Sequence, residues 1–162
     1  MKQTKRLILA SLFAAMTCVA TMVIKIPSPM QGYVNLGDCV VLCCGWLLGP
    51  LYGGMAAGIG SGMADIFGGY TLYAPATMVV KGLMAATAWT LDRAMASRRE
   101  SRIVSGFAAE CVMVSGYLAF ESVLYGLGPS LLNVAPNAVQ GVAGLILGAV
   151  LVNVLEKNRI IE

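Results

Sequence analysis

The chain has 162 residues, of which 58% are hydrophobic and only 12% are charged. A soluble domain carries about a quarter charged residues, so this chain has too little polar surface to cover a water-soluble globule. The composition therefore predicts an integral membrane protein. The net charge of +3 does not indicate a nucleic-acid partner, because the basic residues sit at the ends of apolar runs rather than on one face.

The apolar runs set the number of membrane spans. One span takes about 20 residues, so five or six spans fit, with short loops and no soluble domain. The first run has the length of a span and no clear cleavage site, so we do not expect a cleaved signal peptide. Gly49 and Pro50 break a later run in two. The predicted spans are residues 7–25, 38–48, 51–67, 74–91, 103–127 and 133–155.

The basic residues orient these spans. Six spans place the N-terminus, the hydrophilic stretch 92–102 and the C-terminus on one side, together with most of the Lys and Arg residues. These residues are Lys2, Lys5, Arg6, Arg93, Arg98, Arg99, Arg102, Lys157 and Arg159. The positive-inside rule makes that side cytoplasmic. A five-span count would put the basic C-terminus outside, so the sequence favours an all-α fold of six transmembrane helices in one domain, residues 1–162, with both termini cytoplasmic.

Rows of small residues predict close helix packing. Such rows let helices approach closely in lipid, either within the chain or against a partner. They are Gly54, Gly58 and Gly62 in one span, Gly144 and Gly148 in the last span, and Ala10 and Ala14 in the first.

The sequence offers little for catalysis or metal binding. The chain has no histidine, so the usual base and the commonest metal ligand are missing. Cys39, Cys43 and Cys44 share a span with Val, Leu and Trp neighbours, and we interpret them as small packing residues. Ser61 in GIGSG does not match a G-x-S-x-G elbow, and there is no Walker A sequence. We therefore expect no enzyme activity, no cofactor and no metal.

Two charged residues within spans point to function. Charges inside a membrane are costly and usually mark a functional site. Lys81 and Glu121 lie on neighbouring antiparallel spans, each about 10 Å from the outer end at 1.5 Å per residue. Opposite charges at one depth can form a structural ion pair or bind a polar ligand together. We favour ligand binding, because other polar groups converge at this depth.

Those other groups are amides, carboxyls and tyrosines. Asn133, Asn137 and Gln140 share one face of the last span. Glu110 shares a face of the fifth span with Tyr117 and Glu121. It lies closer to the cytoplasm, so packing or coupling is an alternative role for it. Tyrosines also gather at membrane interfaces for lipid reasons. Together these residues predict an outward-facing pocket for a small, planar, polar molecule. The predicted substrate-binding residues are Tyr33, Asn35, Asp65, Tyr70, Tyr73, Lys81, Tyr117, Glu121, Asn137 and Gln140.

The order of these features resembles the substrate-binding (S) components of energy-coupling factor (ECF) vitamin transporters. The resemblance is carried by LASLFAAM near the start, by YVNLGDCVVLCCGWLLGPLYGG, by AAGIGSGMADIFGGYTLYAPATMVVKGLMA, and by Asn137 with Gln140 in the last span. It covers nearly the whole chain, and its most specific part is ADIFGGYTLYAPATMVVKG.

This resemblance implies a six-helix vitamin binder of the bacterial plasma membrane. It implies docking onto a transmembrane scaffold subunit driven by two cytoplasmic ATPases, with Ala10 and Ala14 at the position of the family's docking motif. The implied ligand is pyridoxine-type or hydroxymethylpyrimidine-type, with riboflavin as a further alternative. A dianionic folate would need more cations than Lys25 and Lys81. Two other functions stay open: a self-contained oligomeric carrier or channel, and a structural membrane subunit.

Overall fold

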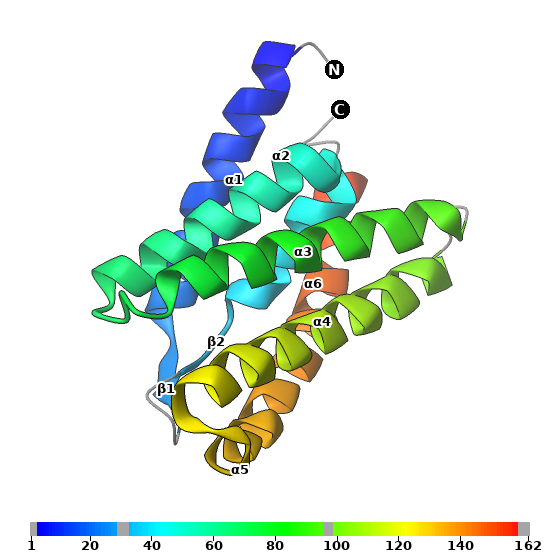
Figure 1. The fold of residues 1–162 in the computed structure, drawn as a ribbon. Coiled ribbons are helices and arrows are strands. Elements are labelled where there is room, and N and C mark those ends of the chain that lie inside the picture. The colour runs from blue at the N-terminus through cyan, green and yellow to red at the C-terminus, as the bar shows by residue number, and fades with distance from the viewer. Residues whose placement is uncertain (1–2, 29–32, 96–98, 159–162) are drawn as a thin grey trace.

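The computed structural model describes residues 3–28, 33–95 and 99–158, and these are almost wholly helical (Figure 1). Three of the basic residues that orient the predicted spans lie outside the described residues: Lys2, Arg98 and Arg159. In chain order, the elements are α1 (Gln3–Val23), β1 (Lys25–Pro27), β2 (Tyr33–Asn35), α2 (Gly37–Phe67), α3 (Ala74–Ala94), α4 (Arg99–Tyr125), α5 (Leu127–Ser130), the 3₁₀ turn η1 (Leu131–Asn133) and α6 (Val134–Lys157).

The second and third predicted spans are joined in one bent element, α2. Its backbone leaves helical geometry at Gly49, with φ 86° and ψ 179°. A positive φ of this size is easily adopted only by glycine, and Pro50, which follows, cannot continue the hydrogen-bond ladder of a helix. The predicted break is therefore in the right place, and it is a kink between two helical halves.

Two segments predicted as loops are partly ordered. In the first, β1 and β2 pair antiparallel, with Lys25 opposite Asn35 and Pro27 opposite Tyr33. In the second, α5 and η1 replace the loop expected at residues 128–132. Gly126, with φ 86°, ends α4 and lets the chain turn directly into α5. The fold is thus all-α, as predicted, apart from one short β-ribbon of two three-residue strands.

Small residues bring the helices together, as the sequence predicts. A Cβ added to Gly58 of α2 would lie 2.6 Å from the carbonyl oxygen of Met78 in α3. A Cβ on Gly60 would lie 2.4 Å from the carbonyl oxygen of Ala14 in α1. Both distances are shorter than real Cβ contacts, so only glycine permits these approaches. The glycine row of α2 therefore packs within the chain, against α3.

The cysteines of α2 lie in the core. Cys43 and Cys44 are fully buried, whereas Cys39 is only partly buried. The sulfur of Cys43 lies 3.7 Å from the carbonyl oxygen of Gly148 in α6, and that of Cys44 lies 3.7 Å from Thr17 Oγ1 in α1. These two side chains fill the space between neighbouring helices, which is the packing role predicted for them.

Four described helical stretches are long and apolar enough to cross a membrane: Gln3–Val23, Gly37–Phe67, Glu100–Tyr125 and Leu127–Lys157. Helix α3, which carries Lys81 and three threonines, is not among them. In Figure 1, the start of α1 and the end of α6 lie at one end of the molecule. The β1–β2 ribbon, the α2–α3 turn and α5 lie toward the opposite end. The number of spans and their orientation stay predictions.

Candidate functional site

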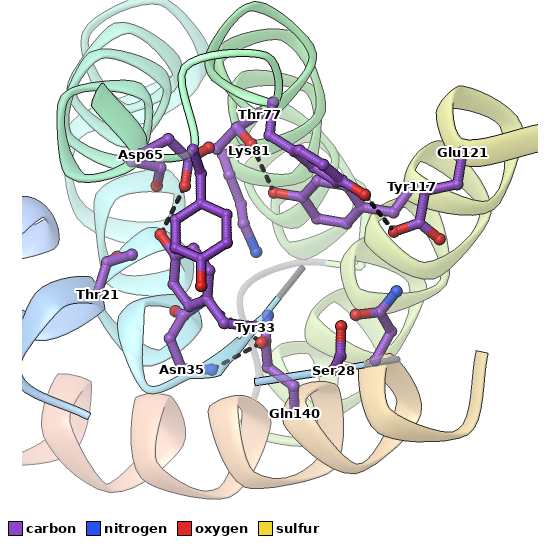
Figure 2. A pocket seen from close by; sticks show the side chains of 14 residues that line it. Thr21, Ser28, Tyr33, Asn35, Asp65, Thr77, Lys81, Tyr117, Glu121 and Gln140 are labelled. Carbon is purple, nitrogen blue, oxygen red and sulfur yellow. Dashed lines mark hydrogen bonds between the residues drawn. The ribbon is translucent and has the colours of Figure 1, made fainter. Parts of the chain in front are cut away.

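A polar cavity lies where β2, the α2–α3 turn and helices α2, α3, α4 and α6 meet (Figure 2). Its side chains lie close together and leave about 30 Å³ of free space between them. All ten predicted substrate-binding residues line it, so the structure brings the whole set together. The lining residues are Thr21, Ser28, Tyr33, Asn35, Ser61, Asp65, Tyr70, Tyr73, Thr77, Lys81, Tyr117, Glu121, Asn137 and Gln140.

Four small lining residues were missed by the sequence analysis: Thr21, Ser28, Ser61 and Thr77. Ser and Thr are common in apolar helices and carry no signal by themselves. Thr77 lies four residues before Lys81 in α3, so its place on the same helix face was detectable. Thr21, Ser28 and Ser61 reach the cavity only through the packing of distant segments, which the sequence does not define.

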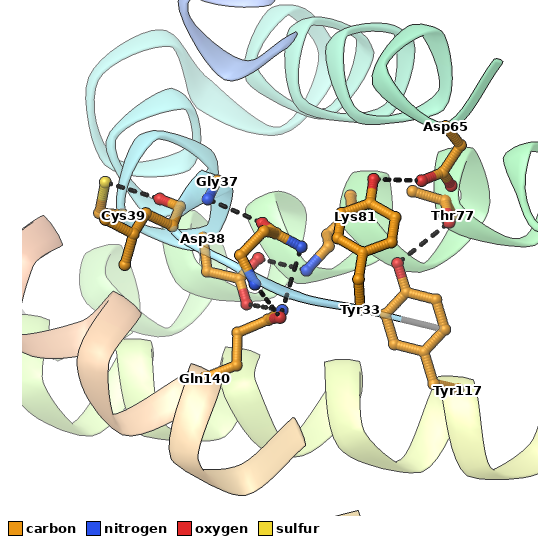
Figure 3. A network of polar contacts seen from close by, with 11 residues as sticks. Tyr33, Gly37, Asp38, Cys39, Asp65, Thr77, Lys81, Tyr117 and Gln140 are labelled. Atoms are coloured by element: carbon orange, nitrogen blue, oxygen red, sulfur yellow. Dashed lines mark hydrogen bonds and ion pairs between the residues drawn. The ribbon is translucent and has the colours of Figure 1, made fainter. Parts of the chain in front are cut away.

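Asp38 was also missed, although it organises the floor of the site (Figure 3). It is fully buried at the start of α2 and forms an ion pair with Lys81 of α3. Its other oxygen accepts a hydrogen bond of 2.7 Å from Nε2 of Gln140 in α6. Gln140 Oε1 in turn accepts hydrogen bonds from the backbone N–H of Asn35, at 2.8 Å, and from its side chain, at 3.3 Å. This network ties α2, α3, α6 and β2 together.

Glu121 has partners of its own and does not pair with Lys81. Its Oε1 accepts hydrogen bonds from Asn133 Nδ2, at 2.7 Å, and from the Tyr73 hydroxyl, at 3.3 Å. The sequence placed Lys81 and Glu121 at one depth, and both do line the cavity. The ion pair considered for them is wrong, because depth along a span does not say which side chains face each other, and Asp38 lies closer to Lys81.

Two tyrosines and Asp65 form another wall of the cavity. The rings of Tyr33 and Tyr70 lie 4.6 Å apart, centroid to centroid, at 47°. The ammonium group of Lys25 lies 4.8 Å from the Tyr33 ring centroid and 5.7 Å from that of Tyr70, within the range of a cation–π contact. The Tyr33 hydroxyl donates a 2.5 Å hydrogen bond to Asp65 Oδ1. Burial, followed by the nearby Asp65 carboxylate, raises the pKa of Tyr33, so this phenol stays a proton donor.

Tyr117 continues the wall on the side of α4. Its hydroxyl donates a 3.1 Å hydrogen bond to Thr77 Oγ1, and its ring centroid lies 5.5 Å from Lys81 Nζ. The cavity thus combines aromatic faces with carboxyl, amide and ammonium groups. This is the usual make-up of a site for a small organic ligand.

Ala10 and Ala14 lie away from this cavity. With Ser11, Ala15 and the second half of α2, they line an apolar groove between α1 and α2. Ala10 is 8% exposed and Ala14 is partly buried. The pair therefore both packs against α2 and borders a surface groove.

Comparison with known proteins gives the family. A family model described as "ECF-type riboflavin transporter, S component" matches residues 1–157. The chain belongs to this family. As an S component, it is a membrane-embedded subunit for the uptake of a vitamin of the riboflavin type, and the family is one of transporter subunits rather than enzymes.

Two other proteins are similar to this chain over most of its length. A protein of Pyrococcus woesei, described as "Uncharacterized protein in gap 3'region", is 38% identical over 142 residues, which cover 86% of this chain and 94% of that protein. A solved structure described as "Structure and mechanism of the S component of a bacterial ECF transporter" matches with a TM-score of 0.71. The match covers 96% of this chain and 98% of the other, at 21% identity, and so shows a shared fold.

Proposed function

We propose that this S component binds a small neutral heteroaromatic vitamin, or vitamin precursor, that carries hydroxyl groups. Compounds of the pyridoxine, hydroxymethylpyrimidine and riboflavin types have this chemistry. The observation that carries the proposal is the convergence of ten polar and aromatic side chains, from five elements and the α2–α3 turn, on one cavity. Convergent polar groups within aromatic walls are typical of small-molecule sites.

Each feature of such a ligand has a counterpart in the cavity. The Tyr33 and Tyr70 rings offer faces against which a heteroaromatic ring can stack. The amides of Asn137 and Gln140 offer both donors and acceptors to ring nitrogens and hydroxyl groups. The family description names riboflavin, which is a hydroxylated heteroaromatic compound and so supports the same ligand class.

We further propose that uptake requires partners. The sequence has no Walker A motif, so the chain does not supply a P-loop ATPase of its own. A transmembrane scaffold subunit and two cytoplasmic ATPases would provide the energy, and the groove beside Ala10 and Ala14 is the proposed docking surface. The site would open to the outside of the cell membrane, with both termini in the cytoplasm.

Mass spectrometry of the compound released from the purified protein tests the ligand. The expected result is a neutral hydroxylated heteroaromatic compound, which calorimetry should then show to rebind with 1:1 stoichiometry. Release of a lipid alone, with no binding of riboflavin, pyridoxine or hydroxymethylpyrimidine, would overturn the proposal.

A separate experiment tests the partners. Uptake of the identified ligand is measured in vesicles that contain this chain with or without the scaffold and ATPases. Uptake only when all subunits and ATP are present supports the proposal. Uptake by the chain alone would instead show the self-contained carrier that the sequence left open.

A further inference from the structure

Another recess lies at the bend of α2, apart from the ligand cavity. The start of α1, the bend at Gly49 and Pro50, and the end of α3 border it, and it leaves about 300 Å³ of free space. None of its lining residues also lines the ligand cavity. We call it the cationic pocket, because its charged side chains are those of Arg6 and Arg93.

The cationic pocket offers hydrogen-bond donors and positive charge. Arg6 and Arg93 are both exposed, and neither forms an ion pair within the part of the chain that the structure describes. The indole N–H of Trp89 and the hydroxyl of Tyr52 are further donors in the same lining. No carboxylate lies among the described lining residues. Two guanidinium groups in one recess favour an anion with several acceptor oxygens, such as a phosphate.

The acidic residue that precedes Arg93 in the sequence does not neutralise the pocket. Asp92 is only 4% exposed and does not line the pocket. One of its oxygens accepts a 2.5 Å hydrogen bond from the hydroxyl of Ser101 in α4. Its charge is therefore held between α3 and α4, and the pocket keeps the charge of two guanidinium groups.

An apolar groove continues from the cationic pocket along the outside of the helices. It runs between the second half of α2 and α3, leaves about 490 Å³ of free space, and shares Pro50 and Leu51 with the pocket. No polar side chain lines it in the described structure, and three of its lining residues are glycines, which leave room between the helices. From Pro50 to Ile59 it follows α2 for about 14 Å, at 1.5 Å per residue.

A cationic pocket that opens into an apolar groove has the two parts that a phospholipid needs. The headgroup phosphate requires cations and donors, and an acyl chain requires an apolar surface. Trp89 and Tyr52 suit the junction of the two, because Trp and Tyr gather at the level of the headgroups. The predicted orientation places the start of α1 and the end of α3 at the cytoplasmic surface, where anionic lipids attract basic residues.

We propose that the cationic pocket binds the headgroup of an anionic phospholipid and that one acyl chain lies in the groove between α2 and α3. The guanidinium groups of Arg6 and Arg93 hold the phosphate from two sides. The lipid thereby connects the start of α1 with the end of α3. This lipid site is separate from the vitamin site and does not depend on which vitamin binds there.

Native mass spectrometry of the full-length protein in detergent tests the headgroup. The protein is titrated with phosphatidylglycerol, which is anionic, or with phosphatidylcholine of the same acyl chains, which has no net charge. We expect one phosphatidylglycerol molecule to bind at least about tenfold more tightly than phosphatidylcholine, which is about 1.4 kcal/mol. Equal affinity for the two lipids overturns the proposal.

A soluble headgroup tests whether the groove takes part. Glycerol 3-phosphate carries the phosphate without acyl chains. We expect a tenfold molar excess of this compound to leave phosphatidylglycerol bound, because the chain in the groove contributes to affinity. Displacement of the lipid would show a site for free phosphate compounds and would overturn the assignment to a lipid.

A double variant tests the two arginines. An arginine near an anionic lipid contributes about 1 kcal/mol, which is about fivefold in affinity. Arg6→Gln with Arg93→Gln should therefore weaken binding of phosphatidylglycerol by about twenty-fivefold. Lys157→Gln is the matched control, because Lys157 is an exposed cation at the end of α6 and does not line the pocket. An unchanged affinity in the double variant, or an equal loss in the control, overturns the proposal. The wild-type preference for phosphatidylglycerol tests it even where the double variant does not fold.

The scaffold subunit is the other possible occupant, because the pocket shares Tyr52 with the groove between α1 and α2. Co-purification of the scaffold with the double variant separates the two. Scaffold binding that is retained while the lipid preference is lost supports a lipid site. Loss of scaffold binding with an unchanged lipid preference would show that the arginines contact the protein partner instead, and would overturn the proposal.

Discussion

Asp38 of α2 and Lys81 of α3 form an ion pair in the interior of the protein, with their side chains 0% and 3% exposed. Removing two charges from water costs several kcal/mol for each ion, and this cost is offset only when the charges are paired and hydrogen-bonded. Gln140 supplies the additional hydrogen bond to Asp38. The pair therefore holds an ammonium group at the edge of the cavity without leaving it uncompensated.

Breaking this pair from one side should destabilise the protein. Lys81→Met leaves a buried carboxylate without its cation, and we expect a loss of about 3–5 kcal/mol in unfolding free energy. The double variant Lys81→Met with Asp38→Leu should recover much of that stability but not the ligand affinity. Thermal unfolding in detergent and calorimetry measure the two effects. Lys25→Met is the control, since Lys25 is less buried. A double variant as unstable as Lys81→Met alone would contradict this account.

The sequence did not predict the partner of Lys81. The span positions predicted that Lys81 and Glu121 lie at one site, and both line one cavity. They did not reveal Asp38, because an acidic residue at the start of a span is also what a helix N-terminus favours. Which side chains meet depends on the rotation of each helix about its axis. That rotation is set by contacts such as Gly58 against the Met78 carbonyl, which only the folded chain shows.

Most of the helices could be predicted from the sequence. The length of each apolar run and the break at Gly49 and Pro50 are local features that the sequence shows directly. The β1–β2 ribbon was not predicted, since its two three-residue strands are stabilised by tertiary contacts. One such contact is the hydrogen bond from the Asn35 backbone to Gln140, a residue 105 positions away. No local pattern encodes a contact at that separation.

The Gln140 contact predicts a link between α6 and the ribbon. Gln140→Leu removes the acceptor for the Asn35 backbone N–H and the donor to Asp38. We expect faster amide hydrogen exchange at Asn35 and a stability loss of about 1–3 kcal/mol, the cost of leaving buried polar groups unpaired. Val139→Ala, at a residue 67% exposed on the same helix, is the control. Unchanged protection of Asn35 would show that the β1–β2 pairing alone orders the ribbon.

The close contact of Gly60 with α1 predicts that a methyl group added at this position would destabilise the protein. In Gly60→Ala the new methyl group would meet the Ala14 carbonyl oxygen at 2.4 Å and Thr17 Cβ at 2.8 Å. Backbone cannot move aside cheaply, so we expect a destabilisation of about 1–3 kcal/mol, as for other overpacked sites. Gly128→Ala meets nothing within 4 Å and should leave the melting temperature nearly unchanged. Equal stability of the two variants would contradict the close approach of α1 and α2.

Topology can be tested by cysteine labelling at exposed positions. In a variant without the native cysteines, Glu100→Cys should react with an impermeant reagent only from the cytoplasmic side. Leu72→Cys, 60% exposed in the α2–α3 turn, should react only from outside. Labelling of Glu100→Cys in intact cells would overturn the six-span orientation.

The groove between α1 and α2 lies apart from the cavity. We therefore predict that a substitution in the groove can prevent docking on the scaffold without changing ligand binding. Ala14→Trp would fill the groove without entering the cavity, because the two share no lining residue. We expect uptake by the complete transporter to be lost while the ligand affinity of the isolated protein changes less than threefold, about 0.6 kcal/mol. Leu12→Trp is the control, since Leu12 lies on α1, is 54% exposed and does not line the groove. Loss of ligand affinity together with uptake in Ala14→Trp would show that Ala14 serves packing within the chain. Retained uptake would show that the scaffold docks on another surface.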